Sequence, residues 1–164
     1  MSTVTAIVSA YYAEEYIEGR LLNLIEQEPR PEIVVVCQAN SVEYTTAKQH
    51  PVSIITTPDI PTIYHAWNLG IEQAHGDYIT NANSDDRLYP GALAELAKVL
   101  DKNEDVGISY SWVDIVETIG GDPVSRFQWS EGGFDKLMGG CFMGPFPMWR
   151  KSLHDEYGLF DGTL

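Results

Sequence analysis

The chain has 164 residues, which suits a single domain with a sizeable core, and 44% of them are hydrophobic, as in ordinary globular proteins. It carries 24 acidic and 10 basic residues, and the resulting net charge of −14 argues against nucleic acid and anionic membranes as partners. The same charge repels a nucleoside diphosphate, so a site for one is expected to need a metal cation.

Short β-branched runs and helical repeats alternate along the first half of the chain. The expected elements are a strand at 3–9, a helix at 14–28, strands at 32–37 and 52–56, and a helix at 61–75 that Gly76 closes. Apolar residues recur at helical spacing from Ile17 to Ile25, which predicts the first helix, and Pro29 ends it. Ser41 is a candidate helix cap in the polar segment after the second strand.

The second half is less regular. The expected elements are a strand at 77–80, a polar loop at 81–86, a helix at 91–100, a strand at 106–116 and a short helix at 149–157. Pro90 opens the first of these helices, and Gly158 ends the second. Glycine-containing turns loosen the pattern after Ile119.

Strands that alternate with helices predict an α/β fold with a mostly parallel sheet and helices on both faces. No linker, repeat or low-complexity run divides the chain, so residues 1–164 are expected to form one domain. In such sheets ligands bind beyond the carboxyl ends of the strands. This rule selects the loops at 10–13, 38–41 and 81–86 as the candidate site.

The third of these loops contains the sequence Asn83-Ser84-Asp85-Asp86 directly after a predicted buried strand. Two adjacent carboxylates repel each other, and a hard cation such as Mg²⁺ or Mn²⁺ relieves the repulsion while it binds phosphate oxygens. The alternative is a solvated turn that precedes the helix after Pro90, because Asp and Asn are common in turns. The position at the end of the fourth strand favours the metal site.

Four segments resemble, in chain order, the motifs of family 2 glycosyltransferases. They are Ile7-Val8-Ser9-Ala10-Tyr11-Tyr12-Ala13-Glu14-Glu15-Tyr16-Ile17, Ala66-Trp67-Asn68-Leu69-Gly70-Ile71, the run from Gly76 to Asp86 with Pro90 and Leu93, and Met148-Trp149-Arg150-Lys151-Ser152-Leu153 followed by Tyr157-Gly158-Leu159-Phe160-Asp161. The resemblance covers nearly the whole chain. It implies the Rossmann-like GT-A fold.

The resemblance also implies an activity and a site. Members of this family transfer a sugar from a nucleotide-diphosphate sugar to an acceptor hydroxyl, usually with inversion, and use Mn²⁺ or Mg²⁺. Asp85 and Asp86 would contact the metal. The nucleotide would contact Ala10, Tyr11, Glu14, Gln38, Asn68, Ser84 and Asp85.

The chain departs from the family pattern at three positions. Asn83 replaces the first acid of the D-x-D-D motif, Cys37-Gln38 replaces an Asp-Asp pair, and Trp67 replaces an arginine. The family's general base follows the last motif and is expected beyond Leu164, so the catalytic base and most of the acceptor-binding part are expected to be absent. The alternative function is therefore a catalytically incomplete GT-A module that binds a nucleotide or a protein.

Two other classes with similar architecture are disfavoured. Nucleotidyltransferases and dinucleotide-binding oxidoreductases need a glycine-rich loop after the first strand, and residues 10–15 contain no glycine. Cys37 and Cys141 are expected to be free thiols, and the chain is expected to be cytoplasmic, with no membrane span. Self-association through an exposed sheet edge stays open. Trp149 and Phe146 are either a sugar platform or, in the favoured interpretation, core residues.

Overall fold

A six-stranded sheet forms the centre of the computed structural model, which describes residues 2–60, 62–128, 132–140 and 143–163. Cys141 and Leu164, which the sequence analysis named, lie outside these ranges, and so does residue 61 at the start of the expected helix. The strands, in spatial order, are β3 (Ser53–Thr57), β2 (Glu32–Gln38), β1 (Val4–Ala10), β4 (Tyr78–Asn81), β8 (Met148–Arg150) and β5 (Ile108–Ser109). The four strands from β3 to β4 are parallel, and β8 is antiparallel to both of its neighbours. The expected α/β fold with a mostly parallel sheet is confirmed.

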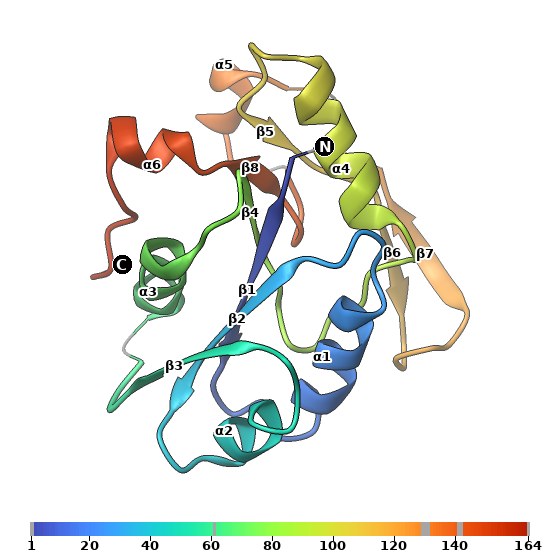
Figure 1. Cartoon of the computed structure of the whole chain (residues 1–164). Helices are drawn as coiled ribbons and strands as arrows, with labels where there is room; N and C mark the ends of the chain where they lie inside the picture. The colour runs from blue at the N-terminus through green and yellow to red at the C-terminus, as the bar shows by residue number, and fades with distance from the viewer. Residues whose placement is uncertain (1, 61, 129–131, 141–142, 164) are drawn as a thin grey trace.

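Helices cover both faces of this sheet, as the sequence predicts (Figure 1). One face packs against α1 (Ile17–Ile25), α2 (Val42–Ala47) and α4 (Ala92–Lys102), and the other against α3 (Ile63–Gln73) and α6 (Ser152–Tyr157). Alternation along β1 divides the core accordingly, because Ala6 and Val8 face the first group and Ile7 faces the second. All three side chains are fully buried.

The ends of the helices follow local signals more closely than periodicity. Ser41 caps α2, and its hydroxyl accepts a hydrogen bond from the Tyr44 N–H, which confirms the expected cap. Thr62 caps α3 in the same way. The first helix begins at Ile17 and not at Glu14, because residues 14–16 form a turn that leads out of β1.

The expected strand at 106–116 is wrong as a single element. Its first part is β5, which pairs with β8, and its second part is β6 (Val113–Val116), which pairs with β7 (Pro123–Phe127) in a separate antiparallel hairpin. The chain leaves the sheet between them, where Ser111 and Trp112 are exposed. The sequence analysis did not predict β7 or the short α5 (Phe134–Leu137).

The expected helix at 149–157 is wrong at its beginning. Residues 148–150 form β8 between β4 and β5, and α6 starts only at Ser152. Met148 and Trp149 are buried in the two halves of the core, and so is Phe146, so the favoured core interpretation of Trp149 and Phe146 is confirmed. No helix among the described residues is long and apolar enough to cross a membrane.

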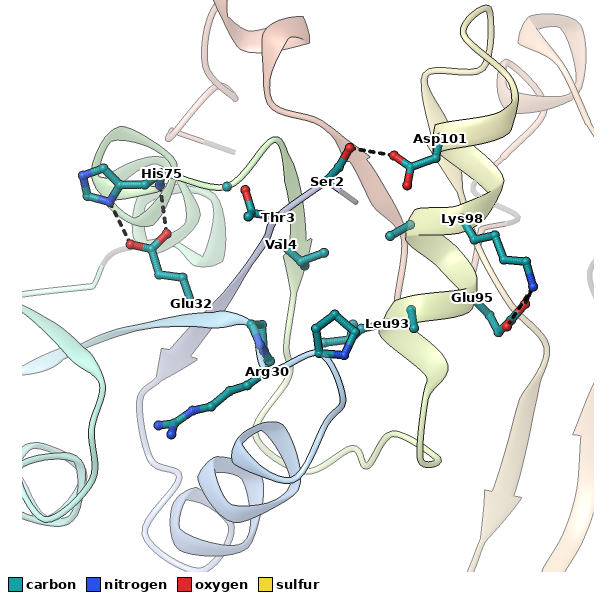
Figure 2. Close-up of a pocket in the computed structure, with 15 residues that line it drawn as sticks. Ser2, Thr3, Val4, Arg30, Glu32, His75, Leu93, Glu95, Lys98 and Asp101 are labelled. Carbon is teal, nitrogen blue, oxygen red and sulfur yellow. Dashed lines mark hydrogen bonds and ion pairs between the residues drawn. The ribbon is translucent and has the colours of Figure 1, made fainter.

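A cavity of about 710 Å³ opens at the amino ends of β1 and β2, beside α4 (Figure 2). Val4 and Leu93 supply apolar lining, and a hydrogen bond between Glu32 and His75 lies at the rim of the cavity, with 2.8 Å between Oε1 and Nδ1. Parallel α/β sheets bind their ligands at the opposite, carboxyl edge. We therefore assign the candidate site to the carboxyl edge of the sheet and not to this cavity at its amino edge.

Candidate functional site

The sheet reverses its strand order between β1 and β4. The chain runs outward from β1 through β2 to β3, and α3 then carries it back to β4 on the other side of β1. This is the topological switch point at which open α/β sheets bind ligands. The acidic loop after β4 meets the end of β1 here, because the Ser84 hydroxyl donates to the carbonyl oxygen of Ser9 at 3.3 Å, and Arg87 Nη2 donates to the carbonyl oxygen of Tyr16 in the loop after β1 at 3.2 Å.

The carboxylates of the acidic loop lie at the surface, and the rest of the loop is anchored below them. Asp85 is exposed and Asp86 is half-buried, whereas Ser84 is buried. Asn83, which replaces an acid of the family motif, donates from Nδ2 to Oδ2 of Asp86 at 3.1 Å. The two acids are therefore adjacent and accessible, and one of them is oriented by the asparagine.

A buried arginine lies beneath this loop. Arg20 from α1 is fully buried, stacks over the ring of Phe146 at 4.7 Å, and donates from Nη1 to the carbonyl oxygen of Asp86 at 3.2 Å. Its Nε and Nη2 have no hydrogen-bond partner among the described residues. Burial, and then the neighbouring charge of Arg87, lower the pKa of Arg20 to about 9, although Asp86 and Asp85 act in the opposite direction.

Asn23 on α1 and Gln27 just after that helix continue this support along the loop. Asn23 donates to the carbonyl oxygen of Leu88 at 2.9 Å and accepts from its N–H at 2.8 Å. Gln27 donates to the carbonyl oxygen of Tyr89 at 3.2 Å. Arg20 and Asn23, three residues apart on α1, and Gln27, two residues past its end, thus hold the main chain from Asp86 to Tyr89.

The loop after β1 carries three of the predicted nucleotide contacts. Ala10 is buried at the end of the strand, and Tyr11 and Glu14 are exposed. The ring of Tyr11 lies 4.3 Å from that of Tyr12, whose φ of 52° turns the chain back toward α1. The loop is held by Glu43, a buried carboxylate on α2 that accepts a hydrogen bond from the Ala13 N–H at 2.8 Å.

Gln38 and Asn68 lie in different surroundings. Gln38 ends β2 and donates to the carbonyl oxygen of Pro58 at 3.3 Å, so it borders the same edge of the sheet. The amide of Asn68 is engaged from both sides by the main chain of Phe160, at 2.7 and 3.0 Å. Asn68 thus holds the C-terminal segment against α3, and its contact with a nucleotide stays a prediction.

The oxygen donors of the acidic loop fit a metal that is bound jointly by protein and substrate, and not a metal whose ligands all come from the protein. Over the described parts of the chain, no group of three or more His, Cys, Asp or Glu side chains converges in a way that could bind a metal. Asp85 and Asp86 supply hard oxygen donors at two consecutive accessible positions. Mg²⁺ and Mn²⁺ sites of this kind take one or two carboxylates and complete their coordination with substrate phosphates and water.

Two cavities border the loop. Asp85 and Asp86 line one of about 330 Å³, which extends to Trp112 on the segment before the β6–β7 hairpin. Asn81 and Asn83 line the other, of about 640 Å³, which extends to α3 and α6. A ligand bound at the acidic pair therefore has space on both sides of the loop.

Two buried charged residues that support the site, Arg20 and Glu43, were not predicted from the sequence. The burial of Arg20 could have been predicted, because this residue interrupts the apolar stripe of α1 between Ile17 and Leu24, where an exposed charge is not expected. The burial of Glu43 could not, because an acid in the first turn of a helix is ordinarily a solvated residue.

Comparisons with known proteins show the sequence family of the chain. The sequence profile of Glycosyl transferase family 2 matches residues 5–156. An uncharacterized glycosyltransferase of Bacillus subtilis (strain 168), YwdF, is 30% identical over 117 residues, which are 70% of this chain and 44% of that protein. An uncharacterized glycosyltransferase of Haemophilus influenzae is 24% identical over 120 residues, 69% of this chain and 37% of that protein. The chain thus spans less than half the length of these relatives.

Solved structures share the fold at low sequence identity. TarS 1–349 of S. aureus, solved in complex with UDP, superposes with a TM-score of 0.77 at 20% identity, over 99% of this chain and 51% of that one. The mannosyltransferase PcManGT from Pyrobaculum calidifontis, solved with GDP-Man and Mn²⁺, gives 0.72 at 22% identity, over 99% and 48%. Both likenesses extend over the whole sheet and support the GT-A fold that the sequence resemblance implied.

Proposed function

Since the chain belongs to glycosyltransferase family 2, we propose that it is the donor-binding part of an enzyme that transfers a sugar from a nucleoside-diphosphate sugar to an acceptor hydroxyl. One observation carries this proposal. The Asp85–Asp86 pair follows the carboxyl end of β4, at the switch point of the sheet, and the preceding Ser84 is hydrogen-bonded to the end of β1. A nucleotide laid along this edge has its diphosphate at the carboxylates.

The chemistry is a direct displacement. The acceptor oxygen forms a bond to C1 of the donor sugar while the bond from C1 to the diphosphate oxygen breaks, and the nucleoside diphosphate leaves with the electron pair. The proton of the acceptor hydroxyl passes to a general base. A single displacement inverts the configuration at C1. A bound Mg²⁺ or Mn²⁺ would neutralise the charge that develops on the leaving diphosphate.

The residues of the chain have distinct roles in this proposal. Asp85 and Asp86 hold the cation, and the exposed ring of Tyr11 with the end of β2 at Gln38 forms the nucleoside side of the site. Ala10 and Ser84 shape the floor between the two loops, and Glu14 stands at its entrance. UDP in the TarS structure and GDP-Man with Mn²⁺ in the PcManGT structure support the ligand class.

A catalytically incomplete module is the second candidate. It is favoured by Asn83, which contributes no charge and engages Asp86 Oδ2 through its Nδ2. Because the site has one acid fewer than the family motif, its affinity for a nucleotide would depend less on a bound metal ion. The two candidates share the nucleotide site and differ in sugar transfer.

Isothermal titration of the chain with UDP, GDP and dTDP, each with and without Mn²⁺, tests the site. We expect one nucleotide to bind in a metal-dependent manner, and Asp85→Asn and Asp86→Asn each to weaken that binding at least about tenfold, or 1.4 kcal/mol. Asp105→Asn, an exposed acid beyond the end of α4, is the matched control and should bind as the original chain does. Undiminished Mn²⁺-dependent affinity in both site variants would refute the assignment.

A further inference from the structure

The 640 Å³ cavity beside the acidic loop has an aromatic wall. Tyr64 and Trp67 from α3 and Phe160 from the C-terminal segment line it, and Trp67 lies 5.4 Å from Tyr64 and 5.9 Å from Phe160 between ring centroids. Tyr64 and Trp67 are half-buried and Phe160 is 37% exposed, so part of each ring faces space and not core. The volume of the cavity lies within the usual range of about 300–1,000 Å³ for small-ligand sites.

Hydrogen bonds hold this wall in place. Asn68 binds the main chain of Phe160 from both sides, and the Thr62 hydroxyl donates to the carbonyl oxygen of Gly162 at 2.9 Å. These side chains belong to α3 and its cap, so the segment that carries Phe160 is fixed to the same helix as Trp67. The aromatic residues therefore form one preorganised surface.

The side of the cavity near the acidic loop is polar and incompletely satisfied. Asn81 lines the cavity and is only 4% exposed, and its Nδ2 donates to the carbonyl oxygen of Pro145 at 3.0 Å and to Oδ1 of Asn83 at 3.4 Å. Its Oδ1 has no donor within the described ranges. Because this Oδ1 is shielded from solvent, the half-buried Asn83 beside it is the polar side chain that a ligand in the cavity contacts.

The lining carries no charge that would recognise an anion. No Lys, Arg, Asp or Glu is among the described residues that line the cavity. His154 Nε2 accepts a hydrogen bond from the Trp149 indole, and Nδ1 lies 3.0 Å from the carbonyl oxygen of Gly158, which suits the neutral ring. A phosphorylated or carboxylated ligand would lose its hydration here without a compensating cation.

From these features we propose that the cavity is an acceptor subsite for an uncharged sugar ring. The apolar face of the ring packs on Trp67 and Phe160, and its hydroxyls reach the half-buried Asn83. Asn83 belongs to the acidic loop, so a hydroxyl held there lies next to the proposed donor diphosphate. That the bound ring is an acceptor rests on the proposed function, whereas the binding of a free sugar ring in this cavity does not depend on it.

Saturation-transfer difference NMR with a panel of uncharged methyl glycosides tests this subsite on the chain alone, without nucleotide or metal. We expect saturation transfer to at least one glycoside in the millimolar range, and at least a fivefold smaller signal for Trp67→Leu. Phe160→Leu is a second variant, in case the first lowers the thermal stability. Trp112→Leu, at the other cavity, should leave the signal unchanged, and a sugar phosphate should give a weaker signal than its methyl glycoside.

Three outcomes would overturn the proposal. One is the absence of saturation transfer to every glycoside, and another is a signal lost in Trp112→Leu but kept in Trp67→Leu and Phe160→Leu. The third is displacement of the glycoside by the nucleotide sugar with Mn²⁺ but not by the nucleotide with Mn²⁺, which would assign the cavity to the donor sugar. Failure of Mn²⁺-dependent nucleotide binding with glycoside binding intact would instead refute the proposed function and leave the sugar site standing.

Discussion

Arg20 combines a high energetic cost with a central position under the acidic loop. It is fully buried, two of its nitrogens have no partner among the described residues, and its pKa is lowered to about 9. The two acceptors that it does contact each have another donor, because Asp86 O also accepts from Arg87 and Asn23 Oδ1 from Leu88 N–H. Little is therefore left unsatisfied when the guanidinium is removed.

We predict that Arg20→Met raises the free energy of unfolding by about 1 kcal/mol or more, since replacing a buried charge by an apolar side chain is often neutral or stabilising. Urea unfolding at pH 7, followed by circular dichroism, measures the change. Arg20→Lys retains the charge without the planar fork and should be less stable than the original chain. Destabilisation of Arg20→Met by more than 1 kcal/mol would show that the guanidinium contributes net stability.

Removal of Arg20 should nevertheless weaken the site. One donor to the Asp86 carbonyl oxygen is lost, and with it one constraint on the main chain that carries the two carboxylates. A single hydrogen bond contributes about 0.5–1.5 kcal/mol, so we expect Mn²⁺-dependent nucleotide affinity to fall by about threefold to tenfold. A gain in stability with a loss of affinity in the same variant would identify Arg20 as a positioning residue.

At the level of elements, the sequence was most informative where packing is local. Strand β1 and strand β2 were recognisable from their apolar runs, and the position of Asp85 and Asp86 followed from the rule for the carboxyl ends of strands. Strand β8 was not recognisable, because its pairing partner β4 lies about 70 residues earlier and decides its conformation. Arg20, Glu43 and the aromatic wall around Phe160 likewise depend on contacts between distant segments.

The contact between α3 and β1 depends on a glycine. Gly70 is buried where the helix crosses the strand, and a Cβ there would lie 2.4 Å from Cγ2 of Ile7, itself fully buried. We predict that Gly70→Ala destabilises the fold by about 1–3 kcal/mol through overpacking, although alanine alone favours a helix by about 1 kcal/mol. Thermal and urea unfolding measure the change.

Gln73→Ala is the matched control for this contact, since Gln73 lies on the same helix and is exposed. It should change stability by less than about 0.5 kcal/mol. Equal or greater stability of Gly70→Ala would mean that the helix can move away from Ile7 without cost. The close approach matters for the site, because α3 also carries Trp67 and Asn68.

At the scale of the whole molecule, the net charge of −14 determines which ligands are attracted to the chain and which are repelled. A nucleoside diphosphate is itself anionic and is repelled over distances comparable to the Debye length, whereas Mn²⁺ is attracted. Arg20 and Arg87 beneath the acidic loop do not cancel this field, since they are 2 of 10 basic residues against 24 acidic ones. The proposed cation therefore serves the approach of the nucleotide as well as its binding.

The negative net charge predicts two salt effects of opposite sign. When NaCl rises from about 20 to about 200 mM, screening should strengthen the metal-free binding of the nucleotide and weaken the binding of Mn²⁺ to the free chain. Titration calorimetry of each ligand alone, at fixed pH, separates the two. If both affinities fall with salt, local contacts with cationic side chains dominate nucleotide binding, and the global charge of the chain does not explain why a cation is needed at Asp85 and Asp86.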